Sequence, residues 1–217
     1  MKIAIVGAGN VGRALATSFT RAGHEVVVTS RDPQHASDLA TTVSRATTAP
    51  SPRAAAEGAD IVVLAIPFSS AADVAADIRS VVAGKPVVDV TNRMSFGSNG
   101  ADMDTSTSNA EELAELLPGA HVIKAFNTLF SSSQSDPVLE SVRLDGFVAG
   151  DDEVAKSAVI RLVDSIGLNP VDVGPLARAR QLEGLAFLNI VLQVTHNGTW
   201  KSGWKLVGAP ATVADAA

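Results

Sequence analysis

The sequence has no cysteine and no tyrosine, and aromatic residues make up only 4% of it. Without cysteine the chain can form no disulfide, thiolate nucleophile or cysteine-ligated metal site, which suits a reducing compartment. We therefore expect a cytoplasmic protein. The four histidines are scattered along the chain, with no two at the spacing of metal ligands, so we also expect no metal site.

Long hydrophobic runs and dense basic runs are missing as well. The apolar run over residues 61–67 is far shorter than the roughly 20 residues that span a bilayer. The 17 basic and 23 acidic residues give a formal charge of −6, and no block of Lys or Arg could follow a nucleic-acid backbone. Residues 1–6 begin like a signal peptide, but Gly7 ends the run and no cleavage-type site follows. We expect neither a membrane nor a nucleic acid as partner.

What is present is a regular alternation of short apolar runs with helical patterns. We predict helices around Ala14–Phe19, ended by Gly23, and over residues 69–82, 111–117, 151–166 and 175–194. The predicted strands cover residues 2–6, 24–29, 59–66, 85–91, 121–126, 146–150 and 170–173. Polar runs over residues 92–108 and 131–137 read as loops. The expected fold class is α/β, a Rossmann-type doubly wound, mostly parallel sheet with a short C-terminal helical extension.

A glycine turn joins the first predicted strand to the first predicted helix. Its residues are Gly7, Ala8, Gly9, Asn10, Val11 and Gly12. In this context the first glycine permits a tight turn, the second lets the main chain approach a pyrophosphate, and the third lets helix and strand pack closely. The free amides and the dipole of the helix favour an anion there. The turn predicts dinucleotide binding; the alternative is a turn that merely links strand to helix.

The residues after the second predicted strand bear on the choice between NAD and NADP. After the last apolar residue, Val28, come the hydroxyls of Thr29 and Ser30 and the guanidinium of Arg31, where an NAD enzyme places a carboxylate. A guanidinium offers a bidentate, charge-assisted grip on a 2′-phosphate, so we predict NADP(H). Two alternatives stay open: Asp32 could serve an NAD ribose, and Arg31 could be an ordinary surface residue.

Further segments carry a resemblance that covers nearly the whole chain. Beside the glycine turn they are residues 30–33 (SRDP), 87–92 (VVDVTN), 108–111 (SNAE), 124–128 (KAFNT), and 172–176 (DVGPL) running into Arg180 and Glu183. With these segments the sequence resembles the NADP-dependent reductases of the deazaflavin coenzyme F420. It also resembles the related reductase domains of the six-transmembrane metalloreductases.

The resemblance implies a cofactor site and an acceptor site. Gly7 to Val11 would hold the pyrophosphate, and Ser30 and Arg31, with His35 nearby, would hold the 2′-phosphate. Ribose and nicotinamide would be flanked by Ala65, Ile66, Pro67, Thr91 and Asn92. The acceptor ring would lie in a pocket formed by Asn127, Thr128, Leu129, Ser202 and Trp204.

Two positions depart from the archaeal deazaflavin reductases. Asn127 stands where those enzymes have histidine, and His35 where they have lysine, which makes His35 the weaker phosphate ligand. The acceptor could therefore be F420, an ordinary flavin (FMN or FAD), or another molecule. Hydride transfer between two rings requires positioning above all, so we nominate no catalytic acid, base or nucleophile.

The C-terminal residues predict how the protein assembles and where its domain ends. Trp200 and Trp204 are four residues apart and could share a helical face. The apolar helix from Pro175 favours a homodimer. We expect one NADP-binding domain over residues 1–208, with residues 175–208 closing the cleft and 209–217 as a tail.

Three functions are compatible with these residues. The leading one is an NADP(H)-dependent oxidoreductase of a flavin-type acceptor, such as an F420 or flavin reductase. The others are an NADP-dependent dehydrogenase or imine-type reductase of a small metabolite, and a regulator that senses NADP(H) without turning it over.

Overall fold

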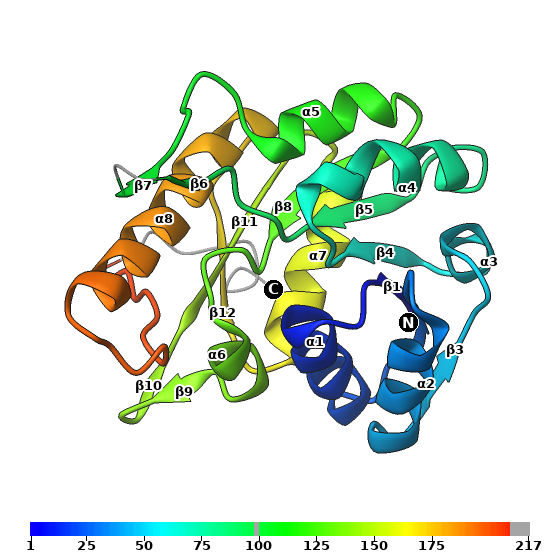
Figure 1. Ribbon diagram of the computed structural model, residues 1–217, viewed down its shortest axis with the longest axis horizontal. Helices are drawn as coiled ribbons and strands as arrows, with labels where there is room; N and C mark the ends of the chain where they lie inside the picture. The colour runs from blue at the N-terminus through cyan, green and yellow to red at the C-terminus, as the bar shows by residue number, and fades with distance from the viewer. Residues whose placement is uncertain (98–99, 209–217) are drawn as a thin grey trace.

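An eight-stranded sheet is the framework of the molecule (Figure 1). The structure is a computed structural model, and it describes residues 1–97 and 100–208. In spatial order the strands are β12 (Asn169–Asp172), β11 (Asp145–Gly150), β8 (His121–Ala125), β5 (Pro86–Asp89), β4 (Ile61–Leu64), β1 (Lys2–Val6), β2 (Glu25–Thr29) and β3 (Ala46–Thr48). Neighbouring strands are parallel except β8 and β11, which are antiparallel. This confirms the predicted mostly parallel α/β sheet.

Helices cover both faces of the sheet. One face packs against α1 (Asn10–Arg21), α2 (Pro33–Thr42) and α7 (Glu153–Ser165). The other packs against α3 (Pro52–Glu57), α4 (Ala71–Ile78), α5 (Asn109–Leu116) and the start of α8 (Ala179–Thr195). Successive residues of β1 alternate between the two layers: Ile3 and Ile5 join the first, Ala4 and Val6 the second. The near-continuous apolar strands therefore have a packing partner on each side.

Local sequence explains where four of the helices begin. The side chains of Asp32, Ser51, Ser108 and Asp152 each accept a hydrogen bond from a backbone N–H in the first turn of α2, α3, α5 and α7. Helix α1 differs, because its first turn follows Gly9, and no described side chain caps it. Its first amides are thus left for another partner.

The two segments predicted as loops contain regular structure. Within residues 92–108, β6 (Ser95–Gly97) and β7 (Gly100–Asp102) form an antiparallel hairpin beside α8 (Figure 1). Within residues 131–137, α6 (Ser131–Ser135) packs on α1, where the Ser18 hydroxyl donates to the Gln134 carbonyl at 2.7 Å. Both loop predictions were wrong in these parts, because contacts with distant residues order polar sequences that carry no periodic apolar signal.

Other short elements also had no counterpart in the prediction. Helix α2, strand β3 and helix α3 occupy a stretch to which the sequence pattern assigned nothing. The remaining elements are the 3₁₀ turns η1 (Phe68–Ser70) and η2 (Leu176–Arg178), which open the predicted helices over 69–82 and 175–194, and the two-residue strands β9 (Val138–Leu139) and β10 (Val142–Arg143). Most of them are too short to show a periodic pattern, and α2, which has ten residues, buries only Ala36 and Leu39.

The chain leaves helical geometry after Thr195, so the prediction that Trp200 and Trp204 share a helical face was wrong. Trp200 has a φ of 57°, and its ring meets that of Phe130 edge to face with centroids 5.2 Å apart. Trp204 instead packs on a cluster that includes Phe147 and Leu182. The predicted tail over residues 209–217 lies outside the described residues.

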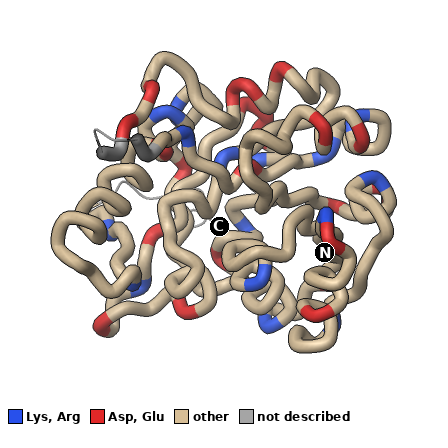
Figure 2. Tube along the Cα trace, in the orientation of Figure 1, with Lys and Arg blue, Asp and Glu red and all other residues tan. Residues whose placement is uncertain are grey.

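The distribution of charge and the character of the helices can be compared with the expectation that the protein binds neither a nucleic acid nor a membrane. Acidic and basic residues are interspersed along the trace (Figure 2). Among the helices of the described chain, none combines the length and apolar character that crossing a membrane requires.

Candidate functional site

A cavity of about 760 Å³ opens at the carboxyl ends of β1, β2 and β4. From β1 the chain proceeds to β2 and β3 on one side, and then crosses to β4 on the other side of β1. Such a reversal of strand order leaves a crevice in which α/β proteins bind ligands. Of the predicted cofactor residues, the cavity is lined by Gly7, Ala8, Gly9, Ser30, Arg31, His35, Ala65, Ile66 and Pro67.

The three glycines of the turn have different surroundings. A Cβ added to Gly7, whose φ is 114°, would lie 2.1 Å from the Ala65 carbonyl oxygen. A Cβ on Gly12 would lie 1.9 Å from the Gly7 carbonyl oxygen, and Gly12 is buried outside the cavity. At Gly9, in contrast, an added Cβ would meet no described atom within 4 Å. Gly7 and Gly12 are thus required by the protein's own packing, whereas Gly9 leaves open space on the cavity side.

The start of α1 supplies the chemistry for an anion beside this open space. Its first turn contains no acidic residue, and its amides have no described side-chain cap. Unsatisfied N–H groups and the positive end of the helix dipole favour a phosphate at such a position. The geometry therefore fits the diphosphate of a dinucleotide.

After the end of β2, some residues face the cavity and another caps the next helix. Ser30 is partly buried and Arg31 is exposed, and both line the cavity. The Asp32 carboxylate accepts a hydrogen bond from the Gln34 amide at 2.9 Å and thereby caps α2. His35 Nε2 lies 3.8 Å from the same carboxylate. Because Asp32 is engaged in the cap, the cavity side of this turn presents a hydroxyl, a guanidinium and an imidazole.

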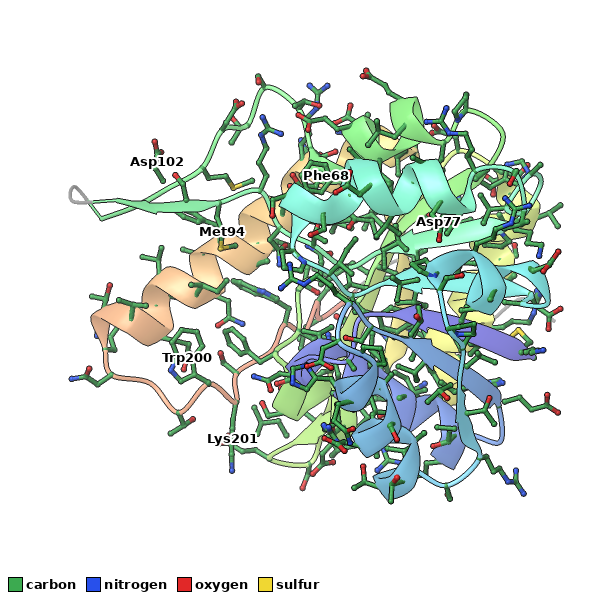
Figure 3. All side chains as sticks on the ribbon, turned by 45° about the vertical axis from the view of Figure 1, so that its right-hand side comes forward. Phe68, Asp77, Met94, Asp102, Trp200 and Lys201 are labelled. Carbon is green, nitrogen blue, oxygen red and sulfur yellow. The ribbon has the colours of Figure 1, made fainter. Side chains whose placement is uncertain are left out.

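A second cavity of about 520 Å³ lies between the glycine turn, the end of β8 and α8. It brings together six predicted residues: Asn10, Val11, Asn92, Asn127, Thr128 and Leu129. The residues that sequence reasoning missed are Phe130, Ser131, Ser132, Ala186, Asn189, Ile190, Thr199, Trp200 and Lys201. Trp200 and Lys201 lie on the segment after α8, well apart from Phe68 and Asp77 (Figure 3). A polar Asn189 among apolar residues of α8 is the signal that could have indicated this wall.

Two asparagine side chains form the floor between the sheet and α8. Asn127 Nδ2 donates to Asn92 Oδ1 at 2.8 Å and to the Leu182 carbonyl at 3.0 Å. Asn92 Nδ2 donates in return to the Asn127 carbonyl at 3.2 Å. The remaining atom, Asn127 Oδ1, is buried and has no partner among the described residues. A buried acceptor without a partner is costly, so this atom is suited to receive a donor from a ligand.

Besides Gly12, three predicted residues line neither of these two cavities. The Thr91 hydroxyl accepts a hydrogen bond from Asn109 Nδ2 at 2.9 Å. The Ser202 hydroxyl donates to Asn189 Oδ1 at 2.5 Å, and thus lies behind the wall that Asn189 forms. Trp204 packs on the cluster with Phe147. All three support the walls from behind.

A buried ionic cluster lies under the end of β5. Lys124 Nζ is 2.7 Å from Asp89 Oδ2 and 2.7 Å from Glu183 Oε1, and all three side chains are at most 1% exposed. Burial raises the pKa of the Glu183 carboxyl above its usual range, although the nearby Lys124 ammonium opposes this shift. A lysine inside an apolar strand was the sequence signal for such a cluster, since a buried ammonium requires partners.

Comparison with known proteins agrees with this geometry. The family described as "NADP oxidoreductase coenzyme F420-dependent" matches residues 2–93. An F420-dependent NADP reductase from Methanothermobacter thermautotrophicus is 32% identical, over 97% of this chain and 96% of its own length. Metalloreductase STEAP3 from Rattus norvegicus is also 32% identical, over 85% of this chain, but the alignment spans only 36% of the metalloreductase.

A solved structure shows the same fold over 95% of the chain. A candidate F420-dependent NADP-reductase from Arthrobacter sp. FB24 superposes with a TM-score of 0.83 and 29% identity, covering 95% of this chain and 99% of that protein. The sequence match to the Methanothermobacter enzyme extends over almost the whole of both chains. The protein therefore belongs to the family of coenzyme F420-dependent NADP oxidoreductases, as its motifs indicated, and is an NADP-dependent oxidoreductase.

Proposed function

We propose that this enzyme transfers hydride between NADP(H) and a flavin-type acceptor, most specifically the deazaflavin coenzyme F420. The observation that carries the proposal is that the two cavities meet at the glycine turn. Gly9 lines the first cavity, whereas the next two residues, Asn10 and Val11, line the second. A dinucleotide whose diphosphate lies on this turn extends from one cavity toward the other.

The residues of the first cavity would hold the adenosine half. The amides of Gly9 to Val11 would bind the diphosphate, and Ser30 and Arg31, with His35, would bind the 2′-phosphate. The cap formed by Asp32 supports NADP(H) over NAD, because the carboxylate that an NAD ribose needs is held against α2. Ala65, Ile66 and Pro67 would flank the ribose.

The residues of the second cavity would hold the two reacting rings. Asn127 Oδ1 is placed to accept a hydrogen bond from an amide or ring N–H, while Asn92 fixes its orientation. Thr128 and Leu129 on one side, and Ile190 and Trp200 on the other, would confine a planar acceptor. The cofactor supplies the hydride, so the protein's contribution is to bind, orient and exclude water.

Turnover assays decide between the candidate functions. NADPH oxidation is measured with F420, with FMN, with small carbonyl and imine compounds and without acceptor, and we expect oxidation with F420. Oxidation only with small carbonyl or imine compounds would indicate a metabolite reductase, and tight NADPH binding without any turnover would indicate a sensor. The F420-dependent relative named above supports the first outcome.

The cofactor assignment has its own test in Arg31→Ala. Removing the guanidinium should weaken NADP(H) binding about tenfold or more and leave NAD(H) binding nearly unchanged, because only the former carries the 2′-phosphate. Arg79→Ala is the matched control, since Arg79 is an exposed arginine that lines neither of the two cavities. An unchanged preference in Arg31→Ala would reject Arg31 as the selecting residue.

We further propose that residues 1–208 act as one domain, in the cytoplasm, and that the enzyme is a homodimer. Helix α8 supports the dimer, because it carries apolar residues around its whole circumference and leaves Leu188, Leu192 and Val194 exposed. Light scattering tests the assembly, and a monomer at micromolar concentration would contradict it.

A further inference from the structure

One carboxylate of α8 accepts hydrogen bonds from the backbone of a segment that is distant in the sequence. Glu183 Oε2 accepts a hydrogen bond from the Arg93 amide at 3.0 Å, and Oε1 accepts one from the Asn109 amide at 2.9 Å. These two amides stand at the two ends of the segment that contains the β6–β7 hairpin. Glu183 therefore fastens both ends of this segment to α8.

The same carboxylate is tied to the sheet through Lys124. Lys124 Nζ donates to Glu183 Oε1 at 2.7 Å, to Asp89 Oδ2 at 2.7 Å and to the Thr91 carbonyl at 2.5 Å. The Thr91 amide in turn donates to Asp89 Oδ1. The loop that leaves β5 is thus fixed at Thr91 and at Arg93, and Asn92 lies between these two points.

The residues on either side of Glu183 contribute to the second cavity. The Leu182 carbonyl accepts the hydrogen bond from Asn127 Nδ2. Ala186 and Ile190 follow at helical spacing and line the cavity. A shift of α8 relative to the loop would therefore change the distance between the α8 wall and Asn92.

Burying a carboxylate costs free energy even when it is paired, and an apolar side chain of similar size is often at least as stabilising. Glu183 is 0% exposed and has three donors, and no hydride transfer step requires it. A contribution to stability is therefore not by itself a sufficient reason for a carboxylate at this buried position.

Building on the proposed function, we propose that Glu183 is a positioning residue that locks α8 to the loop carrying Asn92, so that the walls holding the two reacting rings keep a fixed spacing. It touches neither ring and acts only through Asn92 and the α8 residues that line the second cavity.

The test compares Glu183→Gln with Asp172→Asn. The second change also replaces an ion-paired carboxylate by an amide, since Asp172 Oδ2 is 3.2 Å from the nearly buried Lys156 Nζ, but it lies in β12 and lines neither of the two cavities. In Glu183→Gln one oxygen becomes an NH₂ group that faces a donor, so at least one bond is lost. Glu183→Asp keeps the charge beside Lys124 but shortens the reach, and serves if the glutamine variant does not fold.

Three measurements are made well below each variant's melting temperature. In the Glu183 variants we expect hydrogen exchange at the Arg93 and Asn109 amides to rise about tenfold or more. Affinity for 2′,5′-ADP, which has the 2′-phosphate but no nicotinamide, should stay within about twofold, whereas NADPH affinity falls. The kcat for acceptor reduction should fall roughly 10- to 100-fold, because small displacements of reacting groups are costly. Asp172→Asn should change none of these.

Wild-type exchange at both amides, or a loss of kcat no larger than that of Asp172→Asn, would overturn the proposal and leave Glu183 a stabilising residue only. If the wild-type protein reduces no acceptor, the proposed function fails by itself. Amide exchange and the ratio of NADPH to 2′,5′-ADP affinity would still decide the role of Glu183.

Discussion

At the scale of single residues, the glycine turn separates ligand binding from packing. Gly9→Ala places a methyl group in open space, so we expect the fold to lose only about 1 kcal/mol or less of stability. The same methyl group occupies the space in which the diphosphate would approach the main chain, and NADPH affinity should fall about tenfold or more. Thermal melting and fluorescence titration measure the two effects.

The matched substitution is Gly12→Ala, which places its methyl group against the Gly7 carbonyl. Overpacking of this kind costs about 1–3 kcal/mol or more. The main effect of Gly12→Ala should therefore be a lower melting temperature. If Gly9→Ala binds NADPH as the wild type does, the diphosphate does not lie on this turn.

Glu111 gives a residue-scale prediction about pH. Two nitrogens of Arg180 donate to its carboxylate at 2.8 Å each, and this hydrogen bonding lowers the pKa of Glu111 below its usual 4.5. A carboxyl whose pKa is depressed by folding contributes stability above its unfolded pKa and loses it as the pH falls through the folded value. The difference in melting temperature between wild type and Glu111→Gln should therefore shrink as the pH is lowered from about 5.5 to about 3.

The control for that experiment is Glu115→Gln on the exposed side of the same helix. Its melting temperature should stay close to that of the wild type across the same pH range. If the difference in melting temperature between wild type and Glu111→Gln is constant with pH, the charge of the Glu111 carboxylate contributes nothing to stability.

The local site residues could be predicted from sequence, and the distant ones could not. Gly9 and Arg31 stand in a strand–turn–helix context that is complete within a few residues. Glu183 and Lys124 are separated by 59 positions and meet only through the order of the strands. The ion pair between them arises only in the folded chain, although a lysine within an apolar strand indicates that some acidic partner must exist.

At the scale of elements, one buried carboxylate holds the last described part of the segment after α8. Asp145 at the start of β11 is 0% exposed and accepts bonds from Lys205 Nζ at 2.7 Å and from the Leu206 amide at 2.5 Å. Asp145→Ala should cost about 3 kcal/mol and loosen the segment at Lys205 and Leu206, next to Trp204. Both tryptophans of the chain lie on this segment, so acrylamide quenching of their fluorescence should increase. Quenching that matches the wild type would show that other contacts hold the segment.

Sequence periodicity predicted the elements that bury many apolar residues and missed those that are short or bury few. The strands from β1 to β12 that are continuously apolar were all expected, within a few residues at their ends. The β6–β7 hairpin and α6 were not, because each strand of the hairpin has only three residues and α6 consists of five polar residues. The hairpin segment is held by ion pairs from Arg93 to Asp104 and Glu112, and α6 by α1, neither of which a local pattern reveals.

At the scale of the whole molecule, cofactor binding and folding are linked by mass action. A ligand that binds only the native state, present at about 100 times its dissociation constant, stabilises that state by about 2.7 kcal/mol. In a domain of this size that corresponds to a rise in melting temperature of roughly 5–11 °C. The layers of helices on both faces share one sheet, so a ligand at its carboxyl edge should raise the melting of the whole domain in a single transition.

NADPH should therefore shift the melting temperature by this amount, and NADH at the same concentration should shift it far less. Arg31→Ala should remove most of the difference, because the selecting contact is with the 2′-phosphate. Differential scanning calorimetry at matched ligand concentrations measures both shifts. Equal stabilisation by the two nucleotides in the wild type would contradict selection by Ser30 and Arg31, and two separate transitions would contradict a single cooperative domain over the described residues.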